Sequence, residues 1–397
     1  QMRQVLKFIT TVVLLMAICP RCARSATYFD NKPNEGLRKD MIDYARSVQL
    51  RYTGHRFYTD LERFVTEVNA AAENKPYAWI AQTLNFVDEQ LLIYPPTGDS
   101  SLNDDDKKSA MIRRHLLVIK DYPMHSEKGQ ADFVSAYTTH YLQAMRKLLA
   151  WLDTPAPAQG KMEVFKFINM GVVARTANHC VAFDIWWPGT NSQAVQFSSK
   201  IDALFTTHAH GDHYDHSILA ALSDRPEAFM FMDSTLPEMT GFEDKKKATQ
   251  YMWSEDQTEA TDAGGIKVRA MMGAQAPIPC LLYCVELDGF CIWTAGDNND
   301  HEAAARMTRF TAPDIVCMNV ASPWDISQKA REAVGADKTE SYYLLTHENE
   351  INHDPDGRPG YKFFLEHKDY GVTNPNRQKQ IHSFLVLNVG EHITLSK

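Results

Sequence analysis

The segment from residue 208 to residue 213 limits most strongly what this chain can fold into. It places His208, His210, Asp212 and His213 directly after residues 201–207, an apolar run that predicts a buried strand. Imidazole nitrogens and carboxylate oxygens are ligands of Zn²⁺ and related ions. In an extended chain, residues two apart project to the same side, so the first three side chains can converge while the fourth points toward a second ion. The segment therefore predicts a metal centre at a strand end.

Two later segments add ligand-type residues at predicted strand ends. The apolar run 290–294 leads to Gly-Asp297, and the run 342–346 leads to His347. Together with the motif at 208–213, these segments resemble the signature of the metallo-β-lactamase superfamily. The chain thus carries several features of that family in the family's order.

The resemblance covers about residues 161–397 and implies an α/β fold, the αββα sandwich of the metallo-β-lactamases. The final run 389–395 is similar to the strand that commonly closes that fold. The sequence around His213 and His216, and the spacing of the motifs, look most like the ascorbate-6-phosphate lactonase-like branch. Flavodiiron-type relatives usually have a carboxylate where this chain has His210, so the resemblance favours hydrolysis over oxygen reduction.

The resemblance also implies a set of metal ligands for one or two divalent ions. The expected side chains are His208 and His210 at the first ion, Asp212, His213 and His347 at the second, and Asp297 between them. Zn²⁺ is the expected metal, and Mn²⁺ and Fe²⁺ suit the same donor atoms. Asp212 is also expected to take part in catalysis. His353 is a candidate proton donor or substrate contact, with an ordinary loop residue as the alternative.

Gln275 departs from the family pattern, because it stands where a further histidine of the first metal site is usual. Its amide oxygen can coordinate an ion, although more weakly than an imidazole does. Three interpretations follow from this departure. The first ion is bound with a glutamine or water ligand, only the second site is filled, or the metal centre is degenerate.

Residues 1–26 differ in character from the rest of the chain. Arg3 and Lys7 precede an apolar stretch, and small residues stand at Ala23 and Ser25, which is the arrangement of a secretory signal peptide. Cys19 raises the alternative of a lipid anchor. We expect a periplasmic or secreted protein with no transmembrane span after signal removal.

The charge balance of the chain argues against nucleic acid as a partner. Loss of the signal peptide removes four basic residues and changes the formal net charge from −9 to about −13. Polyanion binding depends on lysine and arginine, so a small-molecule substrate is the expected partner. A homo-oligomer is compatible with the sequence.

The chain divides into a predicted helical domain at 27–158 and a predicted metallo-β-lactamase-fold domain at 159–397. Apolar residues at helical spacing predict helices beginning after an Asp60 cap and covering 107–119 and 131–152. The Pro/Ala/Gly-rich connector at 154–160 marks the boundary. Many strand-like runs with a few helices between them follow it, including 180–187 and 384–389, as in a layered α/β domain.

The sequence also supports predictions for Asp184, Cys284 and Cys291. Asp184 lies at the end of a predicted strand, and a similar aspartate in the family often supports the metal ligands. Cys284 and Cys291 flank a predicted two-residue turn, which places Cys291 opposite Glu286 and argues against a disulfide. The remaining cysteines lie in apolar runs, as buried inert thiols do.

Two functions from different classes remain. The first is an exported metal-dependent hydrolase that uses a metal-bound hydroxide on a lactone, an ester or a phosphodiester. The alternative is a binding protein with little or no catalysis and a degenerate metal centre, which Gln275 motivates.

Overall fold

The computed structural model describes most of the chain apart from its N-terminal segment and several connections. The described residues are 34–96, 104–124, 131–237, 248–275, 278–319, 342–347, 360–361, 383–385 and 387–397. The predicted signal peptide, Cys19 and His353 lie outside them. Within the described residues, no helix combines the length and the apolar character that crossing a bilayer requires.

The first part of the described chain is helical, as its residue spacing predicts. The helices are α2 (Asn34–Gln49), the 3₁₀ turn η1 (Leu50–Tyr52), α3 (Arg56–Asn74), α4 (Ala78–Ile93), α5 (Asp104–Met124) and α6 (Ala131–Leu152). The predicted cap at Asp60 is wrong. The cap lies five residues earlier, at His55, whose side chain accepts a hydrogen bond from the Phe57 backbone N–H at the start of α3.

In the described residues that follow, the strands form two seven-stranded sheets, whose order brings distant parts of the chain together. The first sheet has the order β14-β1-β2-β3-β4-β5-β6 and the second has β13-β12-β11-β10-β9-β8-β7. The strands of the first sheet are β1 (Lys161–Lys166), β2 (Val172–Arg175), β3 (Cys180–Phe183), β4 (Ala203–Phe205), β5 (Phe229–Asp233), β6 (Thr249–Trp253) and β14 (Glu391–Ser396). Those of the second are β7 (Gln257–Ala263), β8 (Ile266–Gln275), β9 (Ile278–Leu287), β10 (Phe290–Thr294), β11 (Ile315–Asn319), β12 (Tyr342–Thr346) and β13 (Ser383–Leu385).

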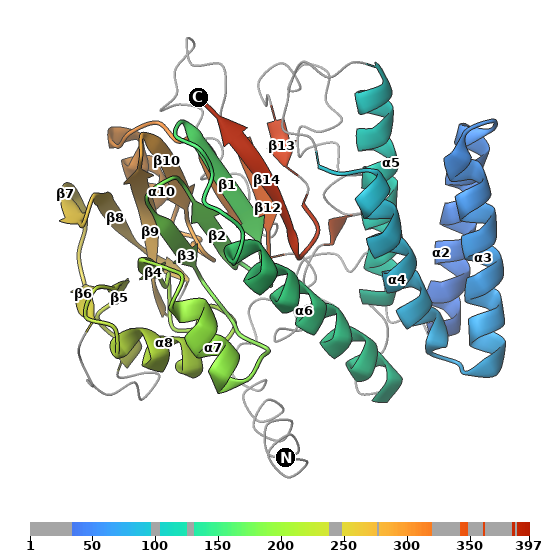
Figure 1. Ribbon diagram of the computed structural model, residues 1–397, viewed down its shortest axis with the longest axis horizontal. Coiled ribbons are helices and arrows are strands. Elements are labelled where there is room, and N and C mark those ends of the chain that lie inside the picture. The colour runs from blue at the N-terminus through green and yellow to red at the C-terminus, as the bar shows by residue number, and fades with distance from the viewer. Residues whose placement is uncertain are drawn as a thin grey trace.

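Three buried hydrophobic clusters show that the sheets and helices form four layers. One cluster lies between the sheets and includes Phe183 and Phe205 of the first and Tyr283 of the second. Another joins the other face of the first sheet to the helices α2–α6, α7 (Asn191–Ser198) and α8 (His216–Ser223). The third covers the outer face of the second sheet with α10 (His301–Arg306) and η2 (Met307–Arg309). The order of layers is therefore helix, sheet, sheet, helix, as expected from the sequence (Figure 1).

The N-terminal helices are joined to the first sheet by apolar contacts and by buried polar contacts. The Arg113 guanidinium of α5 pairs with the Glu391 carboxylate at the start of β14. The Asn388 side chain accepts a hydrogen bond from Lys120 and donates one to Asp88 at 3.0 Å. Apolar residues of α6 and β1 belong to one continuous cluster. The helices therefore share a core with the sandwich, although the sequence changes from helices to strands across residues 153–160.

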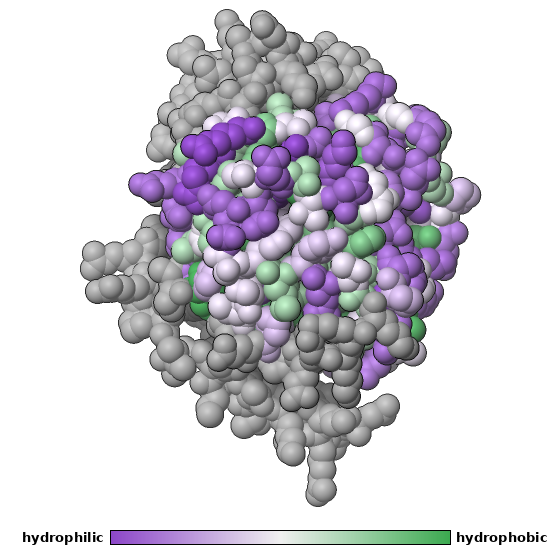
Figure 2. Space-filling view, turned by 90° about the vertical axis from the view of Figure 1, so that its left-hand side faces the viewer, coloured by the Kyte–Doolittle hydropathy of each residue, from purple (hydrophilic) through white to green (hydrophobic). Residues whose placement is uncertain are grey.

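Several elements depart from the expectations. The strand predicted over 180–187 stops at Phe183, because Asp184 adopts a left-handed backbone with φ of 46°. In the run predicted at 384–389, the described strand is β13, Ser383–Leu385. The strand β7 has four exposed residues and little apolar periodicity, so its sequence does not mark it as a strand. This polar strand lies on the side of the molecule drawn in Figure 2, where hydrophilic side chains cover much of the coloured surface. Polar edge strands resist pairing with other chains.

The cysteines in the described part of the chain are free thiols. Cys291 pairs with Glu286 in the β9–β10 ladder, as the turn predicts. The sulfur atoms of Cys284 and Cys291 nevertheless lie 3.6 Å apart, because they are diagonal neighbours on one face of the sheet. Burial raises the pKa of the Cys180 and Cys317 thiols to about 12, which fits inert buried groups.

Candidate metal centre

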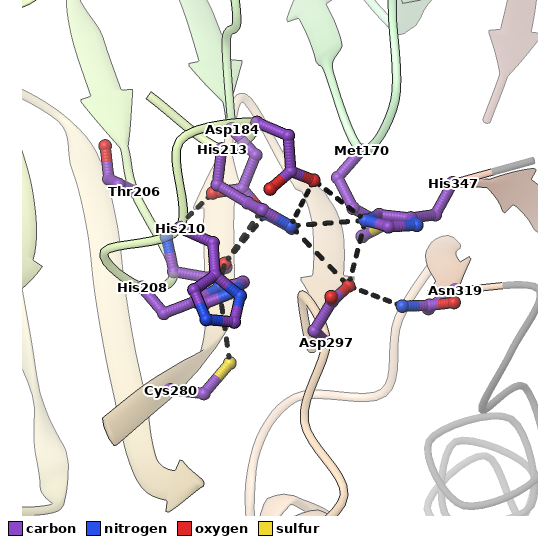
Figure 3. Close-up of polar contacts among 12 residues, drawn as sticks. Met170, Asp184, Thr206, His208, His210, His213, Cys280, Asp297, Asn319 and His347 are labelled. Carbon is purple, nitrogen blue, oxygen red and sulfur yellow. Dashed lines mark hydrogen bonds and ion pairs between the residues drawn. The ribbon is translucent and has the colours of Figure 1, made fainter. Parts of the chain in front are cut away.

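The predicted ligands meet at the carboxyl ends of the central strands of both sheets. The motif segment follows β4, Asp297 follows β10, and His347 follows β12. Strands β3, β4 and β5 run parallel in one sheet and β10, β11 and β12 in the other, so their carboxyl ends share an edge. Figure 3 shows His213, Asp297 and His347 pointing toward one another there.

Three of the side chains, Asp212, His213 and His347, form a buried group that we call site 2. The His213 Nε2 atom lies 3.1 Å from the Asp212 Oδ2 atom and 3.2 Å from the His347 Nε2 atom. The His347 Nε2 atom also lies 3.2 Å from the Asp212 Oδ2 atom. Asp297 adds its Oδ1 atom, which is 3.1 Å from His347 Nε2 and 3.6 Å from His213 Nε2.

These spacings fit a tetrahedral metal ion. For Zn²⁺ with ligand bonds of about 2.0–2.1 Å, neighbouring ligand atoms lie roughly 3.3 Å apart. The contacts of site 2 range from 3.1 to 3.6 Å, and the two imidazole nitrogens face each other in the same cluster. Two imidazoles and two carboxylates are also the donor types that Zn²⁺ binds. The residues present therefore fit a divalent ion.

A second group, which we call site 1, contains His208, His210 and Asp297. The His208 Nε2 atom lies 3.0 Å from the His210 Nδ1 atom. The Gln275 amide stands beside them, since its Nε2 atom donates to the Asp297 Oδ2 atom at 2.9 Å. The Gln275 Oε1 atom is buried, and among the described residues it has no hydrogen-bond partner. A buried oxygen acceptor that lies beside two imidazoles and a carboxylate is suited to binding a cation.

Local contacts within the second sheet place Gln275 against Asp297. The Asn298 side chain accepts a hydrogen bond from the Ala274 backbone N–H at 3.1 Å. The Asn299 backbone N–H donates to the Ala274 carbonyl at 3.0 Å. These bonds hold the end of β8 against the turn that follows β10. Gln275, which the family resemblance places at a ligand position, therefore reaches the carboxylate of Asp297 that is predicted to bridge the two ions.

Asp184 contacts the histidine ligands on their Nδ1 side, away from the metal sites, as expected of a supporting residue. Its Oδ2 atom lies 3.1 Å from His213 Nδ1 and accepts a hydrogen bond from the Thr207 hydroxyl at 2.8 Å. The Thr207 hydroxyl in turn lies 3.0 Å from His208 Nδ1. With protons on both Nδ1 atoms, the Nε2 lone pairs of His208 and His213 face the two sites. Such contacts fix the tautomer of a metal-binding histidine.

Strained backbone surrounds the centre. Asn169, Asp184 and His347 have φ of 55°, 46° and 67°, and Gly296, just before Asp297, has 52°. The Asn169 carbonyl accepts a hydrogen bond from the His347 backbone N–H, which ties the β1–β2 turn to the centre. Left-handed conformations of residues other than glycine persist where the surrounding contacts enforce them, often at functional sites.

Burial and neighbouring charges shift the histidine pKa values in opposite directions. Burial and the neighbouring His213 lower the pKa of His208 well below its usual value. Burial also lowers the pKa of His213, but the carboxylates of Asp212, Asp184 and Asp297 outweigh it and raise the pKa well above the usual value. Site 2 therefore concentrates negative charge and attracts a cation.

Sequence reasoning missed the buried Asn319 at the centre. It ends β11, the strand between the carriers of Asp297 and His347. Its side chain donates to the Asp297 Oδ1 atom (Figure 3). The available signal was its position as a polar residue at the end of an apolar parallel strand. Asp215 caps α8 by accepting from the Ser217 backbone N–H, which holds the start of the helix that follows the motif loop.

Comparison with known proteins gives only distant structural likenesses. No protein-family model matches the chain, and no curated protein matches it significantly. A solved metallo hydrolase from the hyperthermophilic archaeon Ignicoccus hospitalis matches with 15% identity and a TM-score of 0.43, covering 60% of this chain and 99% of that one. The metallo-β-lactamase fold protein YhfI from Bacillus subtilis matches with 11% identity and a TM-score of 0.40, covering 60% and 100%.

A larger protein also matches. CmlA, a diiron β-hydroxylase from Streptomyces venezuelae, has 14% identity and a TM-score of 0.40, and the match covers 62% of this chain and 55% of that one. At such identities and TM-scores the likenesses carry no functional argument.

Proposed function

We propose that this protein is a metal-dependent hydrolase of the metallo-β-lactamase superfamily with two metal sites. One observation carries the proposal: four ligand atoms, from Asp212, His213, His347 and Asp297, lie as close together as the ligands of one tetrahedral ion. The motif order, the four-layer architecture and the adjacent group of His208 and His210 support it.

The chain's own residues would hold and orient the ions. Asp297 would join the two sites, since it belongs to one group and contacts the other. Asp184 would keep His213 in the tautomer that presents Nε2. When bound, a divalent ion supplies Lewis-acid activation of the substrate and of water near neutral pH. Zn²⁺ fits the donor set best, with Mn²⁺ and Fe²⁺ as alternatives.

We assign Gln275 to site 1 as an oxygen ligand and keep Asp212 in the catalytic group. The support for Gln275 is its orphaned Oε1 atom. His353, six residues beyond His347 in the sequence, is proposed as the group that protonates the leaving group. These assignments make the centre asymmetric, because site 2 has two imidazoles and two carboxylates while site 1 has an amide in place of a third imidazole.

The substrate class that we propose is a small lactone, ester or phosphodiester. Each offers a carbonyl or phosphoryl centre whose oxygen develops negative charge during hydrolysis, which a cation stabilises. The acidic character of the chain disfavours nucleic acid. We also propose that the protein is exported, on the strength of the signal-like residues 1–26.

A hydrolysis panel tests the function. The protein, loaded with Zn²⁺ or Mn²⁺, is assayed on lactones, aryl esters and phosphodiesters, before and after chelation. We expect activity on at least one class, loss of that activity on chelation and in His208→Ala, and little change in His179→Ala, which alters a histidine in the β2–β3 turn.

No activity on any class, together with no difference between the unaltered chain and His208→Ala, would reject the hydrolase. If the protein then also fails to take up metal, the result favours the binding protein with a degenerate centre.

A further inference from the structure

The Asp297 carboxylate is held by a separate side-chain amide at each oxygen. The Asn319 Nδ2 atom donates to Oδ1 at 2.5 Å, and the Gln275 Nε2 atom donates to Oδ2 at 2.9 Å. Asp297 is 4% exposed and Asn319 is 4% exposed, so water does not compete strongly for these bonds. The two amides come from different strands, β11 and β8.

The two oxygens have different neighbours in the centre. Oδ1 is the atom within 3.1 Å of His347 Nε2 and 3.6 Å of His213 Nε2, so it belongs to site 2. Oδ2 is the remaining atom, and it is the one that Gln275 contacts beside site 1. Each amide therefore holds the oxygen on its own side of the carboxylate.

We propose that Asn319 and Gln275 set the metal affinities of the two sites separately, Asn319 through Oδ1 at site 2 and Gln275 through Oδ2 at site 1. Asn319 is thus a positioning residue, while Gln275 combines this contact with its Oε1 atom. The inference rests on the metal centre of the proposed function and adds that each amide acts on one of the two metal sites.

The chemistry of the amide group explains the arrangement. A carboxylate oxygen has two lone pairs, so it can accept a hydrogen bond with one and bind an ion with the other. An amide donor fixes the carboxylate without adding a charge that would repel or compete for the cation. Loss of such a supporting contact commonly lowers metal affinity 10–100-fold.

The fold keeps the two contacts independent. Asn319 is positioned by β11, which pairs on both sides with β10 and β12. Gln275 is positioned by the Asn298 contact to Ala274 at the end of β8. Because no strand carries both amides, one can be removed while the other keeps its place.

Competition between the protein and a chromophoric chelator for Zn²⁺ tests whether each amide acts on one metal site. The His210→Ala background removes a ligand of site 1 and reports on site 2, while His347→Ala removes a ligand of site 2 and reports on site 1. Asn319→Leu, which removes the donor at similar volume, and Gln275→Ala are placed in each background. Asn178→Ala serves as the control, because it removes an asparagine–aspartate bond of 3.0 Å at an exposed turn.

We expect Asn319→Leu to weaken Zn²⁺ binding 10–100-fold in the His210→Ala background and less than about threefold in the His347→Ala background. Gln275→Ala should show the reverse, and Asn178→Ala should change neither. Equal weakening by both variants in both backgrounds, or no weakening by either, would overturn the proposal while leaving the hydrolase intact. Absence of Zn²⁺ binding by the unaltered chain would overturn the metal centre itself.

The same two variants in the otherwise unaltered chain give a second test. A two-step Zn²⁺ titration should lose affinity in one step with Asn319→Leu and in the other step with Gln275→Ala. If Asn319→Leu lacks a cooperative thermal transition, Gln275→Ala alone decides: a shift of one step supports the proposal, and a shift of both steps or of neither contradicts it.

Discussion

At the scale of single residues, the metal centre depends on side chains that lie behind the expected ligands. Asp184 contacts both His213 and Thr207, and Thr207 contacts His208. One carboxylate therefore orients an imidazole of each site. The backbone at Asp184 is left-handed, which turns its side chain toward the motif loop at the end of β4.

Replacing this carboxylate should weaken metal binding without unfolding the protein. Asp184→Asn keeps the shape but puts an amide where the Thr207 N–H, the Thr207 hydroxyl and His213 need an acceptor. We expect a 10–100-fold loss of Zn²⁺ affinity, measured by chelator competition. Asp233→Asn, at the end of the neighbouring strand β5, should change the affinity less than threefold. Similar effects of the two substitutions would refute the role given to Asp184.

Gly296 offers a steric test of how closely the motif loop and the turn before Asp297 pack. A Cβ atom at Gly296 would lie 2.3 Å from the Thr207 hydroxyl oxygen, and the residue has φ of +52°. We expect Gly296→Ala to lower the free energy of unfolding by about 1–3 kcal/mol and to weaken metal binding. Gly211→Ala, inside the motif, meets nothing within 4 Å and should cost under about 1 kcal/mol. Urea unfolding of both variants measures the difference, and equal costs would contradict the packing argument.

The residues that the sequence predicted and those that it missed differ in a physical way. Histidine and aspartate at strand ends are recognisable because few other functions need them there, and the structure brings His208, His210, Asp212, His213, Asp297 and His347 together. Asn319 was missed because an asparagine at a strand end is common in ordinary turns. Its contact to Asp297 depends on which strand lies beside which, and that order comes from the sheet topology.

At the scale of elements, the spacing of apolar residues predicted helices and strands well where an element buries one face, and poorly elsewhere. Helix α6 was expected over its full length because its apolar residues recur at helical spacing. Strand β2, whose four residues are all buried, was also missed. Strand β7 was missed because it is mostly exposed and polar. The sandwich architecture was therefore predicted from its apolar strands, whereas the exposed edge strand β7 could not be read from the sequence.

The helical elements should make stability depend on pH. Burial lowers the pKa of His115 in α5 and of His140 in α6 to about 4, from 6.5. Between pH 6.5 and pH 4 the unfolded chain binds more protons, so stability falls as the pH is lowered through this window. A shift of that size corresponds to on the order of 3 kcal/mol for each histidine.

Urea unfolding of metal-free protein across this pH range measures the effect. His115→Gln, which retains a polar partner for the Tyr44 hydroxyl 2.8 Å away, should flatten the decline. The same change at the exposed His392 should leave the decline as steep as in the unaltered chain. An unchanged slope in His115→Gln would show that His115 does not stay neutral in the folded protein.

At the scale of the whole molecule, one edge of the sandwich collects the candidate metal ligands from both sheets, and the helices α2–α8 pack against the face of the first sheet that points away from the second. The Thr207 carbonyl accepts from the Leu281 backbone N–H at 2.8 Å, which joins the sheets beside the centre. Arg113 and Glu391 join the helices to the strand β14. The ligands thus depend on the assembled fold, and ions bound there should stabilise it in turn.

The metal content of the purified protein tests the central claim most directly. The full chain, prepared without a metal-chelating tag, is analysed by elemental mass spectrometry before and after incubation with Zn²⁺ and dialysis. The account predicts about two ions per chain, one at each site, with site 2 retaining its ion longer. About one ion would confine binding to site 2 and contradict the assignment of Gln275. No bound metal, even after Zn²⁺ is supplied, would contradict the metal centre and the hydrolase built on it.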